Sequence, residues 1–171
     1  MPISPIYTKI ITIPQTAIDE NGQVNNVAYV QWMQDIAVEH YESIGGTNPM
    51  QLAGATWVVR EHKIEYLLPA FAGEEIEIKT WVENIRRVRS LRKYEFIRKS
   101  DGKVLVRGET DWVFVDVKSG KPLAIPDEVI KVFTPSALSG TSPKYPTGVR
   151  RIWGRLGLSG VGILKKLRSW D

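Results

Sequence analysis

Five stretches of the chain show either alternation of apolar and polar residues or a β-branched composition, and both are typical of β-strands. In residues 75–83, isoleucine, threonine and valine at even positions alternate with glutamate, lysine and tryptophan at odd positions. A period of two predicts a strand with one covered face. The predicted strands are residues 6–13, 56–66, 74–83, 86–99 and 103–117.

One segment between the first two predicted strands has helical periodicity. Residues 25–43 place aromatic and apolar side chains three or four positions apart, which predicts one amphipathic helix ended by Gly45-Gly46. A short closing helix is predicted at residues 127–133, after Pro126. The shared face of the long helix consists of Tyr29, Trp32, Met33, Ile36, Ala37, His40 and Ile44.

The order of these elements predicts the fold class. One helix follows the first strand, and four strands come next without further helices between them. Turn residues such as Asp101-Gly102 favour antiparallel pairing of neighbouring strands. A parallel doubly wound sheet is disfavoured, because it needs helices that alternate with strands. We therefore predict an α+β fold in which an antiparallel sheet wraps around one long central helix.

The loop before the long helix indicates chemistry. Residues 19–26 read Asp-Glu-Asn-Gly-Gln-Val-Asn-Asn and lead from a strand into the helix start. Backbone N–H groups of a helix's first turn lack intrahelical acceptors and carry the positive end of the helix dipole. Asp19 would therefore lie opposite a site that stabilises a developing negative charge. A base that faces an oxyanion site predicts acyl transfer.

A structural interpretation of the same loop is also available. The tetrapeptide Asp19-Glu20-Asn21-Gly22 is by itself typical of a turn or a helix cap. Asn25 and Asn26 suit a helix start whether or not the site is active. Tyr29 and Trp32 suit packing in a core or in a pocket wall.

Composition narrows the chemistry. The 171 residues include no cysteine, which excludes disulfides, thiolate nucleophiles and cysteine-based metal sites. Only two histidines are present, so a Ser-His-Asp triad would have to use His40 or His62, for both of which a structural role is favoured. We predict carboxylate chemistry without a metal or a cofactor.

Positive charge is concentrated near the end of the chain, whose net charge is +4. Residues 141–171 hold seven of the 23 Lys and Arg residues and only one of the 19 acidic residues. Residues 134–148 are rich in Pro, Ser, Thr and Gly, which predicts a linker. Residues 149–171 predict a basic amphipathic tail that contacts a membrane surface or a protein partner, with disorder in the free protein as the alternative. Nucleic acid binding is disfavoured, because the basic charge is confined to this tail.

Targeting signals are not apparent in the sequence. Residues 1–5 lack the basic start and the apolar run of a signal peptide. No segment approaches the roughly 20 consecutive apolar residues of a membrane-spanning helix. We expect residues 1–133 to form one soluble domain and the protein to be cytoplasmic.

Three ordered motifs give the chain a resemblance to a known family. They are Asp19-x-x-Gly22-x-Val24-Asn25-Asn26-x-x-Tyr29 followed by Trp32, then Pro69-x-x-x-Gly73-Glu74-x-Ile76, and finally Trp112-x-x-Val115-Asp116. Over residues 6–133 the chain resembles hotdog-fold thioesterases of the 4-hydroxybenzoyl-CoA thioesterase type. The resemblance implies hydrolysis of an acyl-CoA thioester, or of an acyl carrier protein thioester, by a homodimer or a larger homo-oligomer.

The resemblance also implies roles for individual residues. Asp19 is the expected catalytic carboxylate, as nucleophile or as general base, and the backbone N–H of Asn26 is the expected oxyanion donor. Neither route needs a metal or a cofactor. The expected substrate-binding residues are Gly22, Gln23, Val24, Asn25 and Tyr29.

Two positions depart from the commonest family pattern. Gln23 stands where the family usually has histidine, and Ala17 stands where an acidic residue is common. Glutamine forms hydrogen bonds but does not titrate near neutral pH, so it cannot shuttle a proton. The alternative hypothesis is therefore a catalytically silent hotdog module that binds acyl thioesters or a protein partner. A hotdog dehydratase is a third hypothesis, but it would need a histidine near the site.

A run of basic residues lies along the strand predicted at residues 86–99. Arg86, Arg87 and Arg89 are candidate contacts for the phosphates of CoA. A solvated strand face is the favoured interpretation of the whole run, which continues through Arg92. Ser90 within it is interpreted as a serine at the surface or at a sheet edge.

Overall fold

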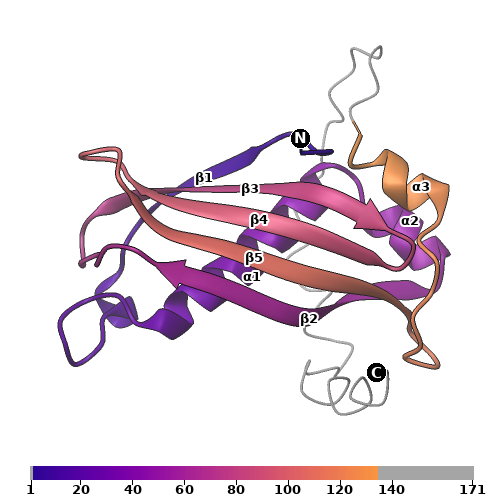
Figure 1. Ribbon diagram of the computed structural model, residues 1–171, viewed down its shortest axis with the longest axis horizontal. Helices are drawn as coiled ribbons and strands as arrows, with labels where there is room; N and C mark the ends of the chain where they lie inside the picture. The colour runs from indigo at the N-terminus through magenta and orange to yellow at the C-terminus, as the bar shows by residue number, and fades with distance from the viewer. Residues whose placement is uncertain (1, 135–171) are drawn as a thin grey trace. The chain divides into compact units, whose positions relative to one another are not determined.

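A single antiparallel sheet forms the body of the protein in a computed structural model that describes residues 2–134 (Figure 1). Its five strands lie in the order β1-β3-β4-β5-β2, so that β1 and β2 are the outer strands. The strands are β1 (Tyr7–Thr12), β2 (Ala55–Tyr66), β3 (Glu75–Arg86), β4 (Arg89–Arg98) and β5 (Val104–Asp116). The predicted strands and their antiparallel pairing are confirmed.

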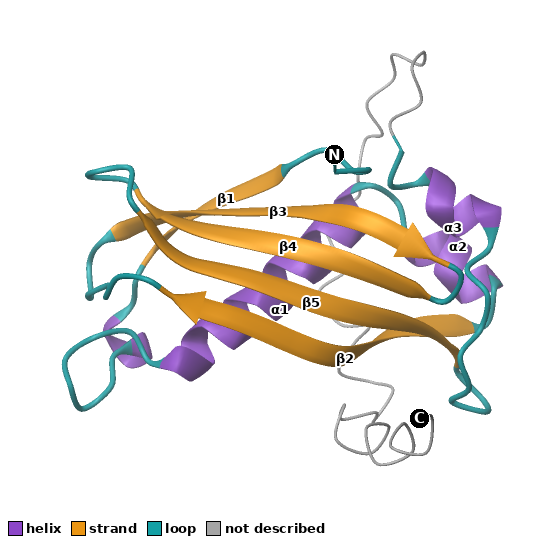
Figure 2. Ribbon diagram, in the orientation of Figure 1, coloured by secondary structure: helices purple, strands orange, loops and turns teal. Residues whose placement is uncertain are grey.

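The long helix α1 (Asn26–Ser43) lies across one face of the sheet (Figure 2). A 3-10 turn, η1 (Gln15–Ala17), precedes it, and α3 (Asp127–Lys131) corresponds to the predicted closing helix. A further short helix, α2 (Thr47–Leu52), was not expected. It follows directly on Gly45-Gly46, and its Pro49 lies in the first turn, where a missing N–H costs nothing. The α+β fold with one long helix against the sheet is therefore as predicted.

Strand alternation decides which side chains reach the helix. In β3 and β4 the even-numbered residues are buried against α1, and the odd-numbered residues are more exposed. Register shifts between Val59 and Glu61 in β2 and between Val82 and Asn84 in β3 mark β-bulges. Because a bulge adds one residue, the side chains that face α1 change parity beyond it.

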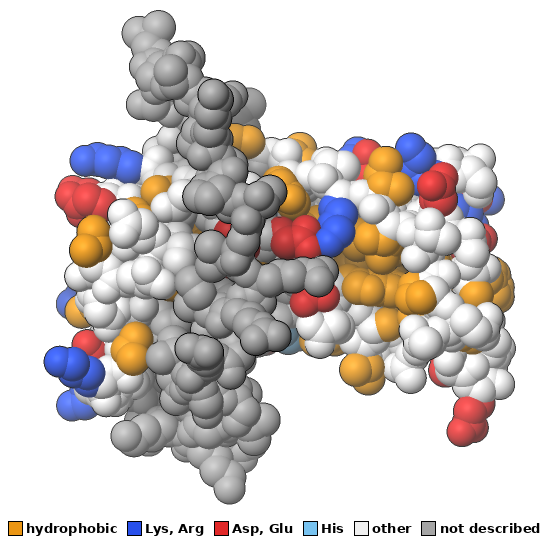
Figure 3. Space-filling view, turned by 180° about the vertical axis from the view of Figure 1, so that it is seen from behind, with side chains coloured by type: hydrophobic (Ala, Val, Ile, Leu, Met, Phe, Trp, Pro, Cys, Tyr) orange, Lys and Arg blue, Asp and Glu red, His pale blue; other side chains and the backbone are white. Residues whose placement is uncertain are grey.

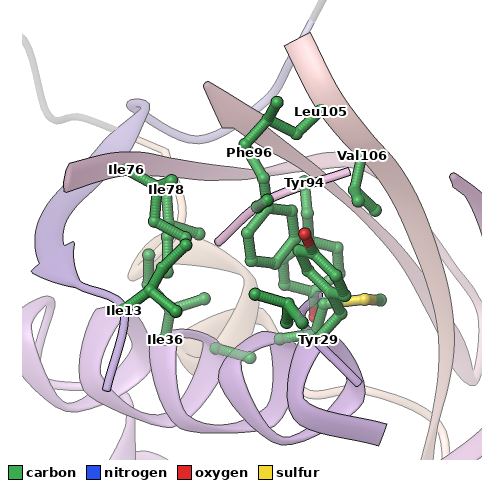
Figure 4. Packing of buried hydrophobic residues seen from close by; sticks show 13 residues of the cluster. Ile13, Tyr29, Ile36, Ile76, Ile78, Tyr94, Phe96, Leu105 and Val106 are labelled. Carbon is green, nitrogen blue, oxygen red and sulfur yellow. The ribbon is translucent and has the colours of Figure 1, made fainter. Parts of the chain in front are cut away.

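The core consists of two clusters of buried hydrophobic residues. The first joins α1 residues such as Tyr29 and Met33 to the middle of the sheet, as Figure 4 shows for Tyr29, Tyr94 and Phe96. The second surrounds Phe114 and brings in Met50 of α2. Burying one such side chain completely contributes about 1.5 to 3 kcal/mol. Both helix ends are thereby held against the sheet.

Three expectations for the basic run and the histidines can be compared with the structure. Arg92 and Ser90 are each only 4% exposed, so the predictions of a solvated Arg92 and a surface Ser90 were wrong. Both residues occupy even positions of the interior strand β4, and even positions face α1. His40 is 1% exposed and packs within the core, as a structural role requires.

His40 and Arg92 form a hydrogen bond inside the protein. Arg92 Nη1 lies 2.8 Å from His40 Nδ1 and 3.2 Å from Thr80 Oγ1. Because a guanidinium only donates, Nδ1 must accept, and the imidazole is therefore neutral with its proton on Nε2. Tyr7 of β1 stacks on the same ring, with centroids 5.3 Å apart.

Residues 135–171 lie outside the described part of the chain, and so do the predicted tail and all of the predicted linker except Thr134. Within residues 2–134, no helix has the length and apolarity that crossing a bilayer requires.

The buried histidine predicts acid sensitivity. Burial, and then the charge of Arg92, lower the pKa of His40 from 6.5 to about 3. Between pH 6.5 and about pH 3, His40 is therefore protonated in the unfolded state and neutral in the folded state. The stability contributed by neutral His40 is complete above pH 6.5 and is lost as the pH falls toward about 3.

Replacing His40 by asparagine tests this linkage, because the amide oxygen still accepts from Arg92 but does not titrate. We expect the His40→Asn protein to lose stability less steeply on acidification, by up to about 1.4 kcal/mol per pH unit. Denaturant unfolding across the pH window measures the slope. His62→Asn is the comparison at the half-buried histidine, where burial also lowers the pKa, and it should flatten the slope less. Identical slopes for wild type and His40→Asn would contradict the prediction.

Candidate active site

The loop that carries Asp19 is closed by its own backbone. Ile18 and Val24 form a β-bridge, and the Asp19 N–H donates to the Gln23 carbonyl over 2.8 Å. The Gly22 N–H donates back to the Asp19 carbonyl over 3.0 Å. Gly22 has φ of 78°, a left-handed conformation that favours glycine. A Cβ at Gly22 would meet nothing within 4 Å, so backbone conformation, not crowding within the chain, accounts for this glycine.

The Asp19 carboxylate is half-buried and anchored on one oxygen. Its Oδ1 accepts hydrogen bonds from the backbone N–H groups of Asn21, at 2.8 Å, and Gln23, at 3.4 Å. Within residues 2–134, Oδ2 accepts none, so this oxygen keeps its lone pairs for another partner. Oδ1 thus has the structural role of a turn residue, as one interpretation of the sequence predicted. Oδ2 remains free to contact a substrate or a water.

The first residue of α1 has an unused amide. Asn25 is the N-cap, and its Oδ1 accepts from the Val27 N–H at 2.9 Å. The Asn25 carbonyl accepts from the Ala28 N–H at 2.9 Å. The N–H of Asn26 makes no hydrogen bond within the described residues, and it carries the positive end of the helix dipole. This is the arrangement that an oxyanion donor needs.

A groove of about 200 Å³ opens beside this amide. One wall comes from the start of α1 and the loop before it, and the other from the end of β2 and the segment that follows. The two walls are joined by the Val24 N–H, which donates to the Ala70 carbonyl over 2.9 Å. The lining residues are Gln23, Val24, Asn26, Tyr29, Tyr66, Leu67, Leu68, Pro69 and Ala70.

The predicted site residues divide into two groups around this groove. Gln23, Val24, Asn26 and Tyr29 line it, whereas Gly22 and Asn25 shape the backbone behind it. Asp19 is not part of the lining but is bonded to the backbone of Gln23, which is. The structure therefore brings the loop and the helix start together, and Asp19 is joined to the groove wall through the backbone of Gln23.

Tyr29, which lines the groove, packs against other aromatic side chains. Tyr29 is 3% exposed, and its ring meets the rings of Phe96 and Tyr66 edge-on at 5.1 and 5.8 Å. Burial, followed by the charge of Glu74, raises the pKa of Tyr29 to about 12. Its hydroxyl is therefore protonated at neutral pH and can donate a hydrogen bond. The predicted role of Tyr29 in packing and in a pocket wall agrees with this position.

The opposite wall was not predicted from the sequence. Tyr66, Leu67 and Leu68 are 40% to 44% exposed and present apolar surface to the groove. The Tyr66 hydroxyl lies 3.4 Å from the Asn26 carbonyl, so it contacts the residue that offers the free amide. Figure 3, which views the α1 side, shows hydrophobic side chains gathered on this face. The signal in the sequence that could have predicted this wall is the apolar run Tyr66-Leu67-Leu68 at the end of β2 and just after it.

Arg98 holds that wall in place. Its Nη2 donates to the Pro69 carbonyl over 2.6 Å, and its Nε lies 3.1 Å from a carboxylate oxygen of Glu74 as an ion pair. Glu74 in turn accepts from the Phe71 N–H over 3.0 Å. The motif Pro69-x-x-x-Gly73-Glu74 therefore has a physical role, because it fixes the segment that faces Asn26.

The candidate CoA-binding arginines lie elsewhere. Arg86 ends β3, Arg87 lies in the turn that follows, and Arg89 begins β4, at the opposite end of these strands from the groove. Arg89 forms a bidentate ion pair with Asp111. One chain does not bring these arginines to the groove. No group of three or more His, Asp or Glu residues in the described ranges is arranged to hold a metal ion.

The fold is that of a known family. The model of the thioesterase-like superfamily matches residues 13–133, and the chain belongs to that superfamily. A search of curated proteins finds no match.

Solved structures share the fold at low sequence identity. The probable thioesterase YbaW from Escherichia coli is 19% identical with a TM-score of 0.68, over 73% of this chain and 94% of that one. The DHNA-CoA thioesterase from Staphylococcus aureus is 23% identical with a TM-score of 0.63, over 70% and 80%. A mutant 4-hydroxybenzoyl-CoA thioesterase complexed with 4-hydroxybenzoyl-CoA is 14% identical with a TM-score of 0.69, over 75% and 99%. These likenesses confirm the predicted hotdog fold.

The helix cap yields a prediction. Asn25→Ala removes the side chain that satisfies the Val27 N–H, and we expect the free energy of unfolding to fall by about 1 kcal/mol. Asn25→Asp keeps an acceptor oxygen and should retain most of that stability. Urea unfolding of the three proteins measures the difference, and equal stability of wild type and Asn25→Ala would show that the cap contributes nothing.

Proposed function

We propose that the protein is a thioesterase of the 4-hydroxybenzoyl-CoA thioesterase type that hydrolyses an acyl-CoA to the free acid and the thiol. The observation that carries the proposal is the unused Asn26 amide at the start of α1, on the wall of a groove next to the Asp19 loop. Membership of the thioesterase-like superfamily supports thioester hydrolysis. An acyl carrier protein thioester is the alternative substrate.

The thioester carbonyl oxygen would accept a hydrogen bond from the Asn26 N–H. As the tetrahedral intermediate forms, negative charge collects on this oxygen, where the amide and the helix dipole stabilise it. Removing one such donor raises the barrier by about 3 kcal/mol in comparable sites. The geometry of the first turn of α1 therefore contributes to the rate as directly as the carboxylate does.

Asp19 would supply the second element through its free Oδ2. As nucleophile, it attacks the carbonyl carbon, the C–S bond breaks, and the thiolate leaves and takes a proton from water. A second water then cleaves the mixed anhydride and restores Asp19. As general base, Asp19 instead takes a proton from the attacking water and passes it to the departing thiolate. In either route the amide side chain of Gln23 orients groups in the groove without transferring a proton.

The groove itself supports an acyl thioester and a second copy of the chain. Its apolar wall at Leu67 and Leu68 suits an acyl group, and both residues remain 40% exposed in one chain. The outer edge of β2, beside this wall, pairs with no strand among the described residues. We propose a homodimer or a larger homo-oligomer in which a second copy closes the groove. In such an assembly, Arg86, Arg87 and Arg89 of a second copy become the candidates for the CoA phosphates.

The proposal predicts the effect of one substitution. Asp19→Asn should leave folding intact, because the amide oxygen still accepts from Asn21 and Gln23. We expect thiol release to fall by about a hundredfold to ten-thousandfold, since the nucleophile or base is lost. Glu20→Gln, on the exposed neighbour, is the matched control and should retain activity. A thiol-detection assay over aromatic, short-chain and long-chain CoA esters measures both, and full activity of Asp19→Asn would reject the assignment.

The alternative is a catalytically silent hotdog module, which Gln23 in place of histidine favours. The same assay distinguishes it, because a binding module should bind CoA esters without releasing thiol. The role of residues 134–171 in contacting a membrane surface or a protein partner and the cytoplasmic location stay predictions.

A further inference from the structure

A row of polar side chains divides the two hydrophobic clusters of the core. Along β3, Thr80 lies between Ile78 of the first cluster and Val82 of the second. His40 separates the clusters in the same way on α1, and Thr110 does so on β5. The strand register joins the row across the sheet, since Thr80 pairs with Tyr94, Arg92 pairs with Thr110, and Thr110 pairs with His62.

Arg92 is the charged member of this row and has no counter-ion. It is 4% exposed, and Nη1 is occupied by His40 Nδ1 and Thr80 Oγ1, which are both neutral. Within residues 2–134, no carboxylate contacts it, and its Nη2 and Nε have no acceptor. Burying a charge without a partner is unfavourable, so proteins ordinarily pair it. The described chain therefore leaves the charge of Arg92 without a balancing carboxylate.

Two further buried donors beside Arg92 also lack acceptors. The Tyr94 hydroxyl and the Trp112 indole N–H are both buried, and neither has a hydrogen-bond partner in the described part of the chain. Tyr94 follows Arg92 on the same face of β4, and Trp112 follows Thr110 on the same face of β5. Thr110 and Trp112 lie close enough to the Tyr94 hydroxyl to influence its ionisation, without completing hydrogen bonds to it. Buried polar groups in native folds are nearly always satisfied, so this cluster of donors indicates a ligand rich in acceptor atoms.

We propose that Arg92, Tyr94 and Trp112 bind a carboxylate at the far end of the acyl group, so that the preferred substrates are CoA thioesters of dicarboxylic acids. This inference rests on the proposed thioesterase function. A carboxylate neutralises the guanidinium and accepts hydrogen bonds from all three side chains, and an arginine fork matches its planar geometry. A plain hydrocarbon end would leave the donors unpaired and the charge uncompensated.

The fold places this cluster within reach of the groove. β2 pairs His62 with Thr110 and Tyr66 with Val106, and Tyr66 lines the groove. The four residues from Tyr66 to His62 span about 13 Å at the usual rise of a strand. Ile64 and His62, which face α1 along this stretch, are only half-buried. α1 crosses the sheet obliquely (Figure 1). An acyl group that follows β2 from the groove over this length reaches the level of Thr110, the cross-strand neighbour of Arg92.

The test compares CoA esters that differ only at the far end of the acyl chain. Adipoyl-, suberoyl- and sebacoyl-CoA are paired with hexanoyl-, octanoyl- and decanoyl-CoA, and kcat/KM is measured for each. We expect the wild-type protein to prefer the dicarboxylic member of at least one pair by about tenfold or more, the value of a hydrogen bond to a charged group. Arg92→Met should abolish the preference, and Tyr94→Phe should reduce it severalfold.

Tyr41→Phe is the matched control. Tyr41 also has a buried hydroxyl without a partner, but it lies in the second cluster beside Trp57 and Phe133 rather than beside Arg92. Its loss should leave the preference unchanged. Tyr94→Phe removes one oxygen and no carbon, so it decides the question if Arg92→Met fails to fold. Equal kcat/KM within every pair, or a preference that survives both substitutions, would overturn the proposal.

A binding measurement separates this inference from the proposed hydrolysis. Free suberate should raise the melting temperature of the wild-type and Asp19→Asn proteins but not that of Arg92→Met, and octanoate should raise none of them. If suberate acts through Arg92 while no CoA ester is cleaved, the carboxylate site stands and the hydrolase fails. If CoA esters are cleaved without regard to the far end and suberate has no effect, the hydrolase stands and the carboxylate site is rejected.

Discussion

The position of the first turn of α1 is the constraint on which the rest of the site depends. Asn25 satisfies the amides of Val27 and Ala28, which leaves the neighbouring Asn26 amide free. The Asn25 N–H itself donates to the Ala17 carbonyl over 2.8 Å, so the helix start is fixed to the segment before the Asp19 loop. Val24 ties the same turn to Ala70 across the groove. These hydrogen bonds therefore fix the positions of the free amide, the Asp19 loop and the apolar wall relative to one another.

Contacts with β4 hold the first turns of α1 and the apolar wall in position. Tyr29 anchors the first turns of α1 on Phe96, and Arg98 on the same strand β4 holds the Pro69 carbonyl. One strand thus supports both walls of the groove. Further along β4, the interior is no longer purely hydrophobic, because the buried Arg92 introduces a charge that the described chain does not balance. We interpret this imbalance as specificity for a ligand, since a hydrophobic residue at that position would pack without the cost.

The sequence predicted the elements whose signal is local. Alternation identified the strands, three-and-four spacing identified α1, and Asn25-Asn26 marked the helix start within one residue. α2 was missed because its Pro49 and the preceding glycines resemble a helix stop. Arg92 was misplaced because a run of basic residues indicates solvent, whereas its position in an interior strand decides its burial.

Site residues that depend on long-range contacts escaped prediction. Tyr66 and Arg98 lie 40 residues or more beyond Asn25 in the chain, and only the folded sheet brings them to the loop. Gly22 was expected to bind the substrate, whereas its positive φ gives a backbone reason for glycine. Arg86 and its neighbours share a chain with the groove but lie at the other end of the strands, so a second copy is needed before they can contribute.

The proposed function depends on where the thioester carbonyl lies. A crystal structure of the Asp19→Asn protein with a bound acyl-CoA would locate it. We expect the carbonyl oxygen to lie within hydrogen-bond distance of the Asn26 N–H, with the carbonyl carbon facing the side chain at position 19. An acyl-CoA bound with its thioester away from the start of α1, and the groove empty, would contradict it.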